Sequence, residues 1–549
     1  MTATRKKAPD QDQRDAALRE RQRNVLIDAG AGTGKTTILV ERLVNMVAPR
    51  DDAAAIPISR IAAVTFTRRA AGELRFRIRE ELLADLASES VEERQRPLLH
   101  DALAGLDTAH VGTIHSFADR LLRLRPREAR LSPAFEILED NEELVHETFT
   151  LLLEGAQSGT LGVAFVGTPY EALASEAERI VQDALRAGLR ANQRETEWWV
   201  YGGLDTLVRG LVNLRDLQPT PPEVSAVDLE MFRKYAREFI ERAKNVRGSA
   251  PGQQWLIRNS AVLRRLFDET DPVAIFAEML RYLGRKPSDT SKGVGFADDE
   301  GAWAAWYAFA GDKRKKAVRA TPLSHDLLGP FHRWMASRLV RLQPIVLRLY
   351  EQVKARHRAV DQIELLLGLR ELLHRDKEAR AEYQVLFDHV LVDEFQDTDP
   401  LQAEILLYLC ENGARADCWD EVDLSPGKLT LVGDPKQSIY RFRRADIAMY
   451  DRVRSVVARG PHLPVRLSAN FRSQPALIGW FNDRFENVLG PCADPEHPFD
   501  PKTGKVFHQG LLPGATPGAS KAVQSCTWFL SSARKGMARP TSIESSKLS

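Results

Sequence analysis

Residues 25–36 read Val-Leu-Ile-Asp-Ala-Gly-Ala-Gly-Thr-Gly-Lys-Thr, and a helical pattern continues through residues 37–43. A β-rich run, a glycine-rich loop and a helix in this order are the context in which a phosphate-binding loop occurs. The glycines let backbone N–H groups turn toward phosphates, and the positive end of the following helix favours the same anions. We therefore predict a nucleotide-binding loop made of Ala29, Gly30, Ala31, Gly32, Thr33, Gly34, Lys35 and Thr36.

Two side chains of this loop have specific expected tasks. Lys35 is predicted to reach the β- and γ-phosphates, and the Thr36 hydroxyl to ligate Mg²⁺. Ala29 occupies a position at which the strict pattern has glycine. A glycine-rich turn without a nucleotide is the alternative interpretation. The strand–loop–helix order and the Gly-Lys-Thr triplet at 34–36 favour the phosphate loop.

A second candidate element is the acidic stretch Asp-Glu-Phe-Gln-Asp-Thr-Asp at residues 393–399, directly after the apolar run 390–392. Asp393 is predicted to hold Mg²⁺ through water, because hard cations prefer carboxylate and water oxygens. Glu394 is predicted to orient and deprotonate the attacking water. The alternative is a solvated acidic turn that caps a helix starting near Leu401. The phosphate loop upstream favours a nucleotide-hydrolysing site made of both elements.

The fold class follows from further short β-rich runs at residues 61–64, 110–111, 390–392 and 429–432, most of them followed by helical patterns. Strands that alternate with helices and are apolar on both faces indicate a parallel sheet covered by helices. We therefore predict an α/β fold. Ligands of such sheets bind at the carboxyl ends of the strands, where these motifs lie.

Composition limits the class of protein. The 549 residues are 43% hydrophobic and 28% charged, which is typical of a globular chain with several domains. A net charge of +1 means that any nucleic-acid surface must be local. The four cysteines lack metal-ligand spacing, and no apolar run reaches the ~20 residues of a membrane span. We predict a cytoplasmic protein with no membrane partner.

Six motifs in this order resemble the superfamily 1A DNA helicases of the UvrD/Rep type, and within them the AddA/RecB-like branch. Arg68 stands where that family usually has asparagine, and Phe471 where it usually has tyrosine. The motifs are the phosphate loop at 29–36, Val-Thr-Phe-Thr-Arg-Arg-Ala-Ala at 64–71, Thr-Ile-His-Ser-Phe at 113–117, Asp-Glu-Phe-Gln-Asp-Thr at 393–398, Val-Gly-Asp-Pro-Lys-Gln-Ser-Ile-Tyr-Arg-Phe-Arg at 432–443 and Leu-Ser-Ala-Asn-Phe-Arg-Ser at 467–473.

The resemblance implies further roles at the nucleotide site. Gln13 matches the glutamine that reads adenine, which makes ATP the expected nucleotide, and Phe471 would stack on the base. Gln437 would sense the γ-phosphate. Arg472 would act as an arginine finger, a task that suits the rigid guanidinium fork. The expected catalytic set is Lys35, Asp393, Glu394, Gln437 and Arg472.

The resemblance also implies a DNA-contacting set. Backbone phosphates are the expected partners of Thr65, Thr67 and His115. Aromatic faces can stack on unpaired bases without sequence preference. The expected stacking residues are Phe66, Tyr440 and Phe442, and ordinary core packing is the alternative for each of them.

The domain order implied by the resemblance is a RecA-like ATPase sheet interrupted by a large helical insertion. We expect domain 1A at residues 1–125 and 381–460, and a mostly helical domain 1B at 126–380. Residues 461–502 would begin a second RecA-like domain, 2A. The expected disordered or aberrant tail is 503–549, which has glycine, proline and serine but no sustained periodicity.

The function implied is an ATP-dependent 3′-to-5′ DNA helicase with ATP and Mg²⁺ as cofactors, acting in recombination and double-strand-break repair. Its partners would be single-stranded or tailed duplex DNA and the other subunits of a recombination complex. The later motifs of a second RecA-like domain are not found after Arg472. The alternative is therefore a truncated fragment that binds ATP and single-stranded DNA without unwinding.

Overall fold

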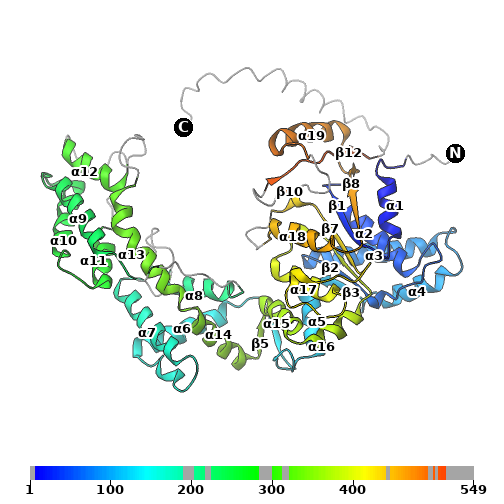
Figure 1. Ribbon diagram of the computed structural model, residues 1–549, viewed down its shortest axis with the longest axis horizontal. Helices are drawn as coiled ribbons and strands as arrows, with labels where there is room; N and C mark the ends of the chain where they lie inside the picture. Colours follow the sequence, from blue (N-terminus) through cyan, green and yellow to red (C-terminus); the bar gives the residue numbers. More distant parts are fainter. Residues whose placement is uncertain are drawn as a thin grey trace, which may run out of the picture. The chain divides into compact units, whose positions relative to one another are not determined.

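The computed structural model describes residues 7–189, 203–216, 224, 226–283, 299–311, 321–439, 445–492, 499–500 and 505–514. The chain divides into two compact units (Figure 1). Unit 1 comprises residues 1–133 and 364–549, and unit 2 comprises residues 134–363. The identification of these units with helicase domains 1A, 1B and 2A remains a prediction.

Unit 1 is built on a six-stranded parallel sheet with the strand order β3-β2-β6-β7-β1-β8. Every residue of β2, β6 and β7 is buried, because helices cover both faces of the sheet. The predicted α/β fold is therefore confirmed. The strands are β1 Asn24–Ala29, β2 Ile61–Thr65, β3 His110–Thr113, β6 His389–Val392, β7 Leu429–Gly433 and β8 His462–Leu467.

Helices α1 to α4 share one apolar core with the sheet, which includes Ile27, Ala63 and Val432 from its strands. Helices α17 and α18 lie on the other side of the sheet (Figure 1). The helices of unit 1 up to β8 are α1 Gln11–Arg19, α2 Lys35–Val47, α3 Arg68–Ala87, α4 Gln95–Gly105, α5 Ile114–Leu124, α15 Gln362–Arg375, α16 Lys377–Leu386, α17 Pro400–Cys410 and α18 Ile447–Val457.

Unit 2 is mostly helical and has its own apolar core, which runs from Leu144 to Ala359. A short parallel pair, β4 Glu136–Leu138 and β5 Ala359–Asp361, joins its two ends. The helices are α6 Glu142–Ser158, α7 Glu171–Arg186, α8 Leu204–Asn213, α9 Leu229–Ala243, α10 Pro251–Arg265, α11 Pro272–Tyr282, α12 Glu300–Ala310, α13 Leu323–Val340 and α14 Gln343–His357.

After β8 the chain forms β9 Ala469–Asn470, α19 Pro475–Leu489, β10 Phe499–Asp500, β11 Lys505–Val506 and β12 Leu512–Pro513. Residues 505–514 belong to the tail that we expected to be disordered, yet β11 pairs with β10 and β12 pairs with β9. Their order comes from hydrogen bonds to distant residues, such as Leu512 N–H to the Ser468 carbonyl at 2.8 Å. Local composition does not reveal such pairing. The rest of that tail lies outside the described residues.

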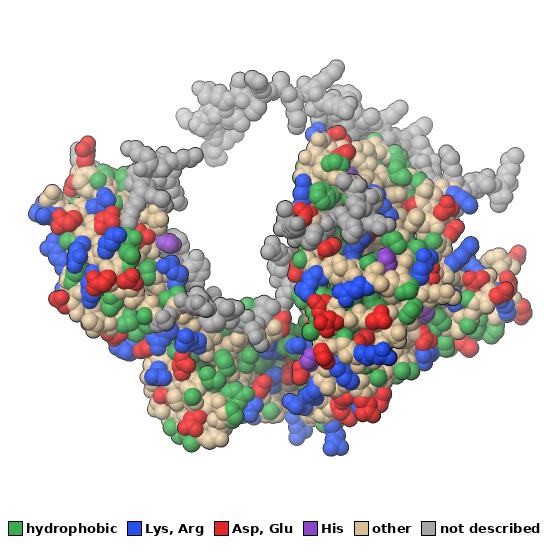
Figure 2. Space-filling model, in the orientation of Figure 1, with side chains coloured by type: hydrophobic (Ala, Val, Ile, Leu, Met, Phe, Trp, Pro, Cys, Tyr) green, Lys and Arg blue, Asp and Glu red, His purple; other side chains and the backbone are tan. Residues whose placement is uncertain are grey.

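The surface of each unit carries acidic and basic side chains interspersed with one another on the face drawn in Figure 2. This agrees with the net charge of +1 for the sequence. Within the described part of the chain, no helix has the length and apolarity that crossing a membrane requires.

Acid sensitivity is expected from a buried histidine at the start of β6. His389 is 6% exposed, and its Nδ1 lies 2.8 Å from the Gly427 carbonyl, to which it donates. Burial lowers the pKa of His389 to about 4, and the positive charge of Arg42 contributes to that fall. A folded-state pKa below the ordinary value means that stability is full above pH ~6.5 and is lost as the pH falls toward 4.

The variant His389→Asn keeps a donor for Gly427 and removes the titration. We expect it to lose less stability than the parent protein between pH 7 and pH 4.5, by at most about 3 kcal/mol. Urea unfolding at the two pH values measures this, with the exposed His100→Asn as the matched control. His110, whose pKa burial also lowers to about 4, contributes a residual acid sensitivity in every variant. An unchanged pH dependence in His389→Asn would contradict the assignment.

Candidate nucleotide site

The phosphate loop lies between β1 and α2, at the carboxyl end of the sheet. Gly34 has φ +86° and precedes Lys35, the first residue of α2. Gly32 has φ +75°, and a Cβ there would lie 2.8 Å from Cβ of Arg472 and 2.9 Å from Nδ2 of Asn470. The loop therefore requires glycine at 32 both for its backbone conformation and for this close approach.

The predicted acidic pair, Asp393 and Glu394, lies beside the phosphate loop, although Asp393 is 357 residues from Thr36 in the chain. Thr36 Oγ1 lies 3.5 Å from Asp393 Oδ2. Lys35 Nζ lies 2.8 Å from Glu394 Oε2. Two oxygen-bearing side chains beside a phosphate-binding loop suit a hard divalent cation, which takes its remaining ligands from water and substrate phosphates.

The lysine of the loop is the most informative side chain of the site. Lys35 is 9% exposed. It forms the ion pair with Glu394, but among the described residues its Nζ has no hydrogen bond of good geometry. An ammonium that is buried beside one carboxylate still has N–H donors to satisfy, so the arrangement favours an anionic ligand at this place.

Asp393 and Glu394 differ, because burial shifts the pKa of Asp393 while the backbone of Glu394 is strained. Burial raises the pKa of Asp393 to about 6, the negative charge of Glu394 adds to that rise, and the Lys35 ammonium opposes it. Glu394 has φ +51°, a left-handed conformation that costs free energy in a residue with a side chain. Such strain at the end of a strand is typical of a functional turn, since the surrounding structure must hold it.

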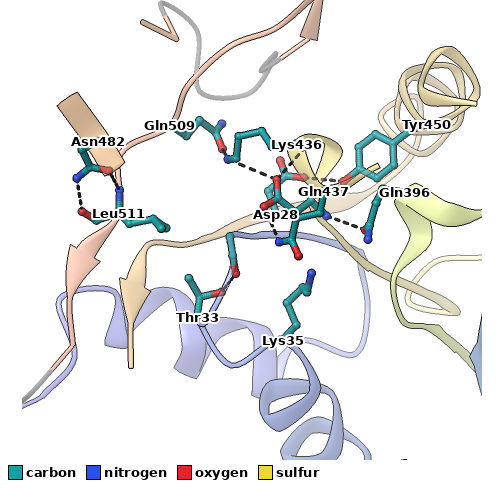
Figure 3. A network of polar contacts seen from close by, with 12 residues as sticks. Asp28, Thr33, Lys35, Gln396, Lys436, Gln437, Tyr450, Asn482, Gln509 and Leu511 are labelled. Atoms are coloured by element: carbon teal, nitrogen blue, oxygen red, sulfur yellow. Dashed lines mark hydrogen bonds and ion pairs between the residues drawn. The ribbon is translucent and has the colours of Figure 1, made fainter. Parts of the chain in front are cut away.

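A chain of hydrogen bonds links Glu394 to Gln437, and Figure 3 shows its members Gln396 and Gln437. Gln396 Nε2 donates to Glu394 Oε2 at 2.7 Å, and Gln396 Oε1 accepts the Asp434 N–H at 2.9 Å. Gln437 Nε2 then donates to Asp434 Oδ2 at 2.8 Å. Gln396 belongs to the acidic motif, but the sequence assigned it no role. Its side chain thus connects Glu394 to the segment that carries Gln437.

The segment that carries Phe471 and Arg472 is bound to the phosphate loop. Asn470 Nδ2 donates to the Ala31 carbonyl at 2.7 Å, and Phe471 N–H donates to the Gly32 carbonyl at 2.9 Å. The Phe471 ring is 52% exposed beside the loop. Both predicted residues therefore lie at the nucleotide side of the sheet. Their roles toward the base and the γ-phosphate remain predictions.

A cavity of about 610 Å³ opens beside this segment. Gln13 lines it from α1, together with Asp10, Asp28, Ser468 and Leu511. The side chain of Gln13 is exposed, as a base-reading amide requires. The cavity therefore places Gln13 where a ligand can reach it.

Two further contacts at the loop were not expected from the sequence. Asp28, in β1, accepts a hydrogen bond from Tyr450 Oη at 2.8 Å (Figure 3). It also pairs with Arg454 at 2.5 Å. Asn482 makes two hydrogen bonds to the backbone of Leu511, whose side chain lies over Gly30. An aspartate directly after the apolar run 25–27 was a signal for the first contact. The sequence held no signal for the second.

The described residues of the predicted DNA-contacting set gather where β2 and β3 end. Thr67 caps α3 by accepting the Ala70 N–H at 3.1 Å, and His115 lies in the first turn of α5. Burial lowers the pKa of His115, and the positive charge of Arg68 lowers it further. Phe66 is partly buried between β2 and α3.

Thr65 is 3% exposed, and its hydroxyl donates to the Thr67 carbonyl at 3.1 Å, so a phosphate contact would require this bond to break. Tyr440 and Phe442 lie outside the described residues. The DNA contacts of all six residues remain predictions.

Comparison with known proteins identifies related sequences over most of the chain. The family model of the UvrD/REP helicase N-terminal domain matches residues 10–457. A similar protein is an ATP-dependent helicase/nuclease subunit from Geobacillus kaustophilus (strain HTA426), 30% identical over 519 residues, which covers 87% of this chain and 39% of the relative.

Two relatives from Lactococcus lactis are similar over the same extent. The ATP-dependent helicase/nuclease subunit from subspecies lactis (strain IL1403) is 26% identical, over 88% of this chain and 40% of the relative. The exonuclease/helicase protein RexA of subspecies cremoris (strain MG1363) is 25% identical over the same shares. The chain thus spans about two fifths of the length of these curated relatives.

Proposed function

The chain belongs to the family of UvrD/REP helicase N-terminal domains, and we propose that it binds and hydrolyses ATP as the motor part of a DNA helicase. The observation that carries the proposal is the buried Lys35 ammonium, which faces Glu394 at 2.8 Å beside a glycine loop. A phosphate group satisfies that ammonium, and the loop's backbone N–H groups accommodate the same charge.

Each residue of the candidate site has a proposed task. Lys35 and the loop hold the β- and γ-phosphates, and Thr36 with Asp393 holds Mg²⁺, whose charge offsets that of the phosphate oxygens. Glu394 accepts a proton from the attacking water. Gln437 senses the γ-phosphate, and Arg472 acts on it as an arginine finger. Gln13 and Phe471 take the adenine base.

The proposed substrate is DNA, because relatives that match this chain are named as helicase/nuclease subunits. Single-stranded or tailed duplex DNA would pass over the ends of β2 and β3, and movement would be 3′-to-5′, as in the helicases that the motifs resemble. The cellular setting that we propose is cytoplasmic recombination and double-strand-break repair, with the chain acting in a complex with other subunits.

A DNA-dependent ATPase assay tests the proposal. We expect phosphate release to rise several-fold when single-stranded DNA is added, because the hydrogen-bond chain from Glu394 reaches Gln437, which lies three residues before the predicted stacking residue Tyr440 in the sequence. Duplexes with a 3′ single-stranded tail should be unwound faster than duplexes with a 5′ tail. Failure of the protein to bind ATP with Mg²⁺ would overturn the proposal. ATP and DNA binding without strand separation would instead favour the non-unwinding fragment.

A further inference from the structure

A buried ion pair at the start of α1 contacts both parts of the candidate nucleotide site. Arg14 and Asp10 are joined by two hydrogen bonds, Nε to Oδ1 at 2.8 Å and Nη2 to Oδ2 at 3.1 Å. Both residues are less than one tenth exposed. Arg14 Nη2 also donates to the carbonyl of Thr33 in the phosphate loop at 2.8 Å. One guanidinium therefore contacts both Asp10 and the loop, whose own shape is held by the bond from Thr33 Oγ1 to the Gly30 carbonyl at 2.8 Å.

Asp10 extends the same contact to the segment after β8. Its Oδ2 accepts the N–H groups of Ser468 at 2.7 Å and Ala469 at 2.9 Å. Burial by itself would raise the pKa of Asp10, but the hydrogen bonds from Arg14, Ala469 and Ser468 outweigh it and keep that pKa below its ordinary value. The carboxylate stays ionised at neutral pH and connects the phosphate loop to the chain that leads into Phe471.

The aromatic ring of Phe471 completes the arrangement. The Cζ atom of Arg14 lies 5.1 Å from the ring centroid, a cation–π distance. The ring is still 52% exposed, so part of its surface is open to a ligand. Arg14 already donates to Asp10 and Thr33, and Asp10 balances its charge. It is thus placed to hold the ring rather than to attract phosphate.

We propose that Arg14 is a positioning residue that fixes the ring of Phe471 relative to the phosphate loop, so that the base of a purine nucleoside triphosphate stacks while its phosphates occupy the loop. The inference rests on the proposed ATP site. Its particular claim is that Arg14 strengthens binding of the base and not of the phosphates. A merely structural ion pair would weaken both kinds of ligand alike, or only the fold.

The experiment compares ATP with inorganic tripolyphosphate, each with Mg²⁺, by titration calorimetry on the full chain. Arg14→Met is expected to weaken ATP binding roughly tenfold, a loss in the range of one stacking interaction, and tripolyphosphate binding by less than about twofold. Arg14→Lys should behave like Arg14→Met, because an ammonium cannot bridge Asp10 and Thr33 as the guanidinium fork does. Arg19→Met, an exposed arginine on the same helix, is the matched control.

A double-mutant cycle makes the test specific to the ring. If Arg14 acts through Phe471, Arg14→Met should add less than about a twofold loss of ATP affinity in a Phe471→Ala background. Should Arg14→Met fail to fold, Arg14→Lys retains a positive charge beside Asp10 and carries the same comparison.

Four results would count against the proposal. Equal losses for ATP and tripolyphosphate would overturn it, and so would independent, multiplying losses in the double variant. ATP binding by Arg14→Met as tight as in the parent would overturn this inference alone. Failure of the parent to bind either ligand would overturn the proposed ATP site and this inference with it.

Discussion

Replacing Glu394 with glutamine is expected to lower the rate of ATP hydrolysis by about 10²–10⁴-fold, the range for loss of a general base. The amide keeps the size of the side chain and can still accept the hydrogen bond that Gln396 donates to Oε2. It cannot take a proton from water. The change therefore removes the chemical step and leaves the surrounding hydrogen bonds in place.

ATP binding by Glu394→Gln should be equal to or tighter than in the parent. The parent must separate Lys35 Nζ from Glu394 Oε2, now 2.8 Å apart, before a phosphate can take the carboxylate's place. An uncharged amide makes that separation easier. Phosphate release and fluorescent-nucleotide titration measure the two effects. The exposed Glu371→Gln in α15 is the control. Turnover equal to that of the parent would show that Glu394 is not the base.

Replacing Lys35 with methionine is expected to weaken ATP binding by about 10²-fold or more, because a charge-assisted contact with the phosphates is lost from a buried place. Methionine keeps most of the apolar stem, so the loop should still fold. The rate of ATP hydrolysis should fall by at least the same factor as the affinity for ATP. Lys35 is also the positive charge that opposes the raised pKa of Asp393, so its loss makes that carboxyl harder to ionise and a metal harder to hold.

Titration calorimetry with ATP and Mg²⁺ measures the Lys35→Met effect, and thermal unfolding without nucleotide checks the fold. The exposed Lys244→Met in unit 2 changes the same residue type away from the site. If Lys35→Met bound ATP as tightly as the parent, the buried ammonium would have another purpose and the phosphate loop assignment would be wrong.

The sequence alone predicted the parts of this protein that depend on neighbouring residues. The β-rich run, the glycines and the Gly-Lys-Thr triplet lie within residues 25–36, and the parallel α/β fold follows from the repetition of strand and helix. The expectation of a disordered tail from residue 503 differed from the structure at 505–514, because β12 is ordered by pairing with β9 and not by its own composition.

Only the tertiary structure showed how these parts meet. Thr36 lies 3.5 Å from Asp393, and Arg14 contacts the ring of Phe471, although the members of each pair are far apart in the chain. The left-handed backbone of Glu394, with φ +51°, depends on such contacts between distant segments. Periodicity and spacing record which face of an element is apolar, and they carry no information on which distant hydrogen-bond partner a buried polar group finds. The sequence therefore predicted the phosphate loop and its sheet, and the packing of α1, β6 and β9 around them decided the rest of the candidate site.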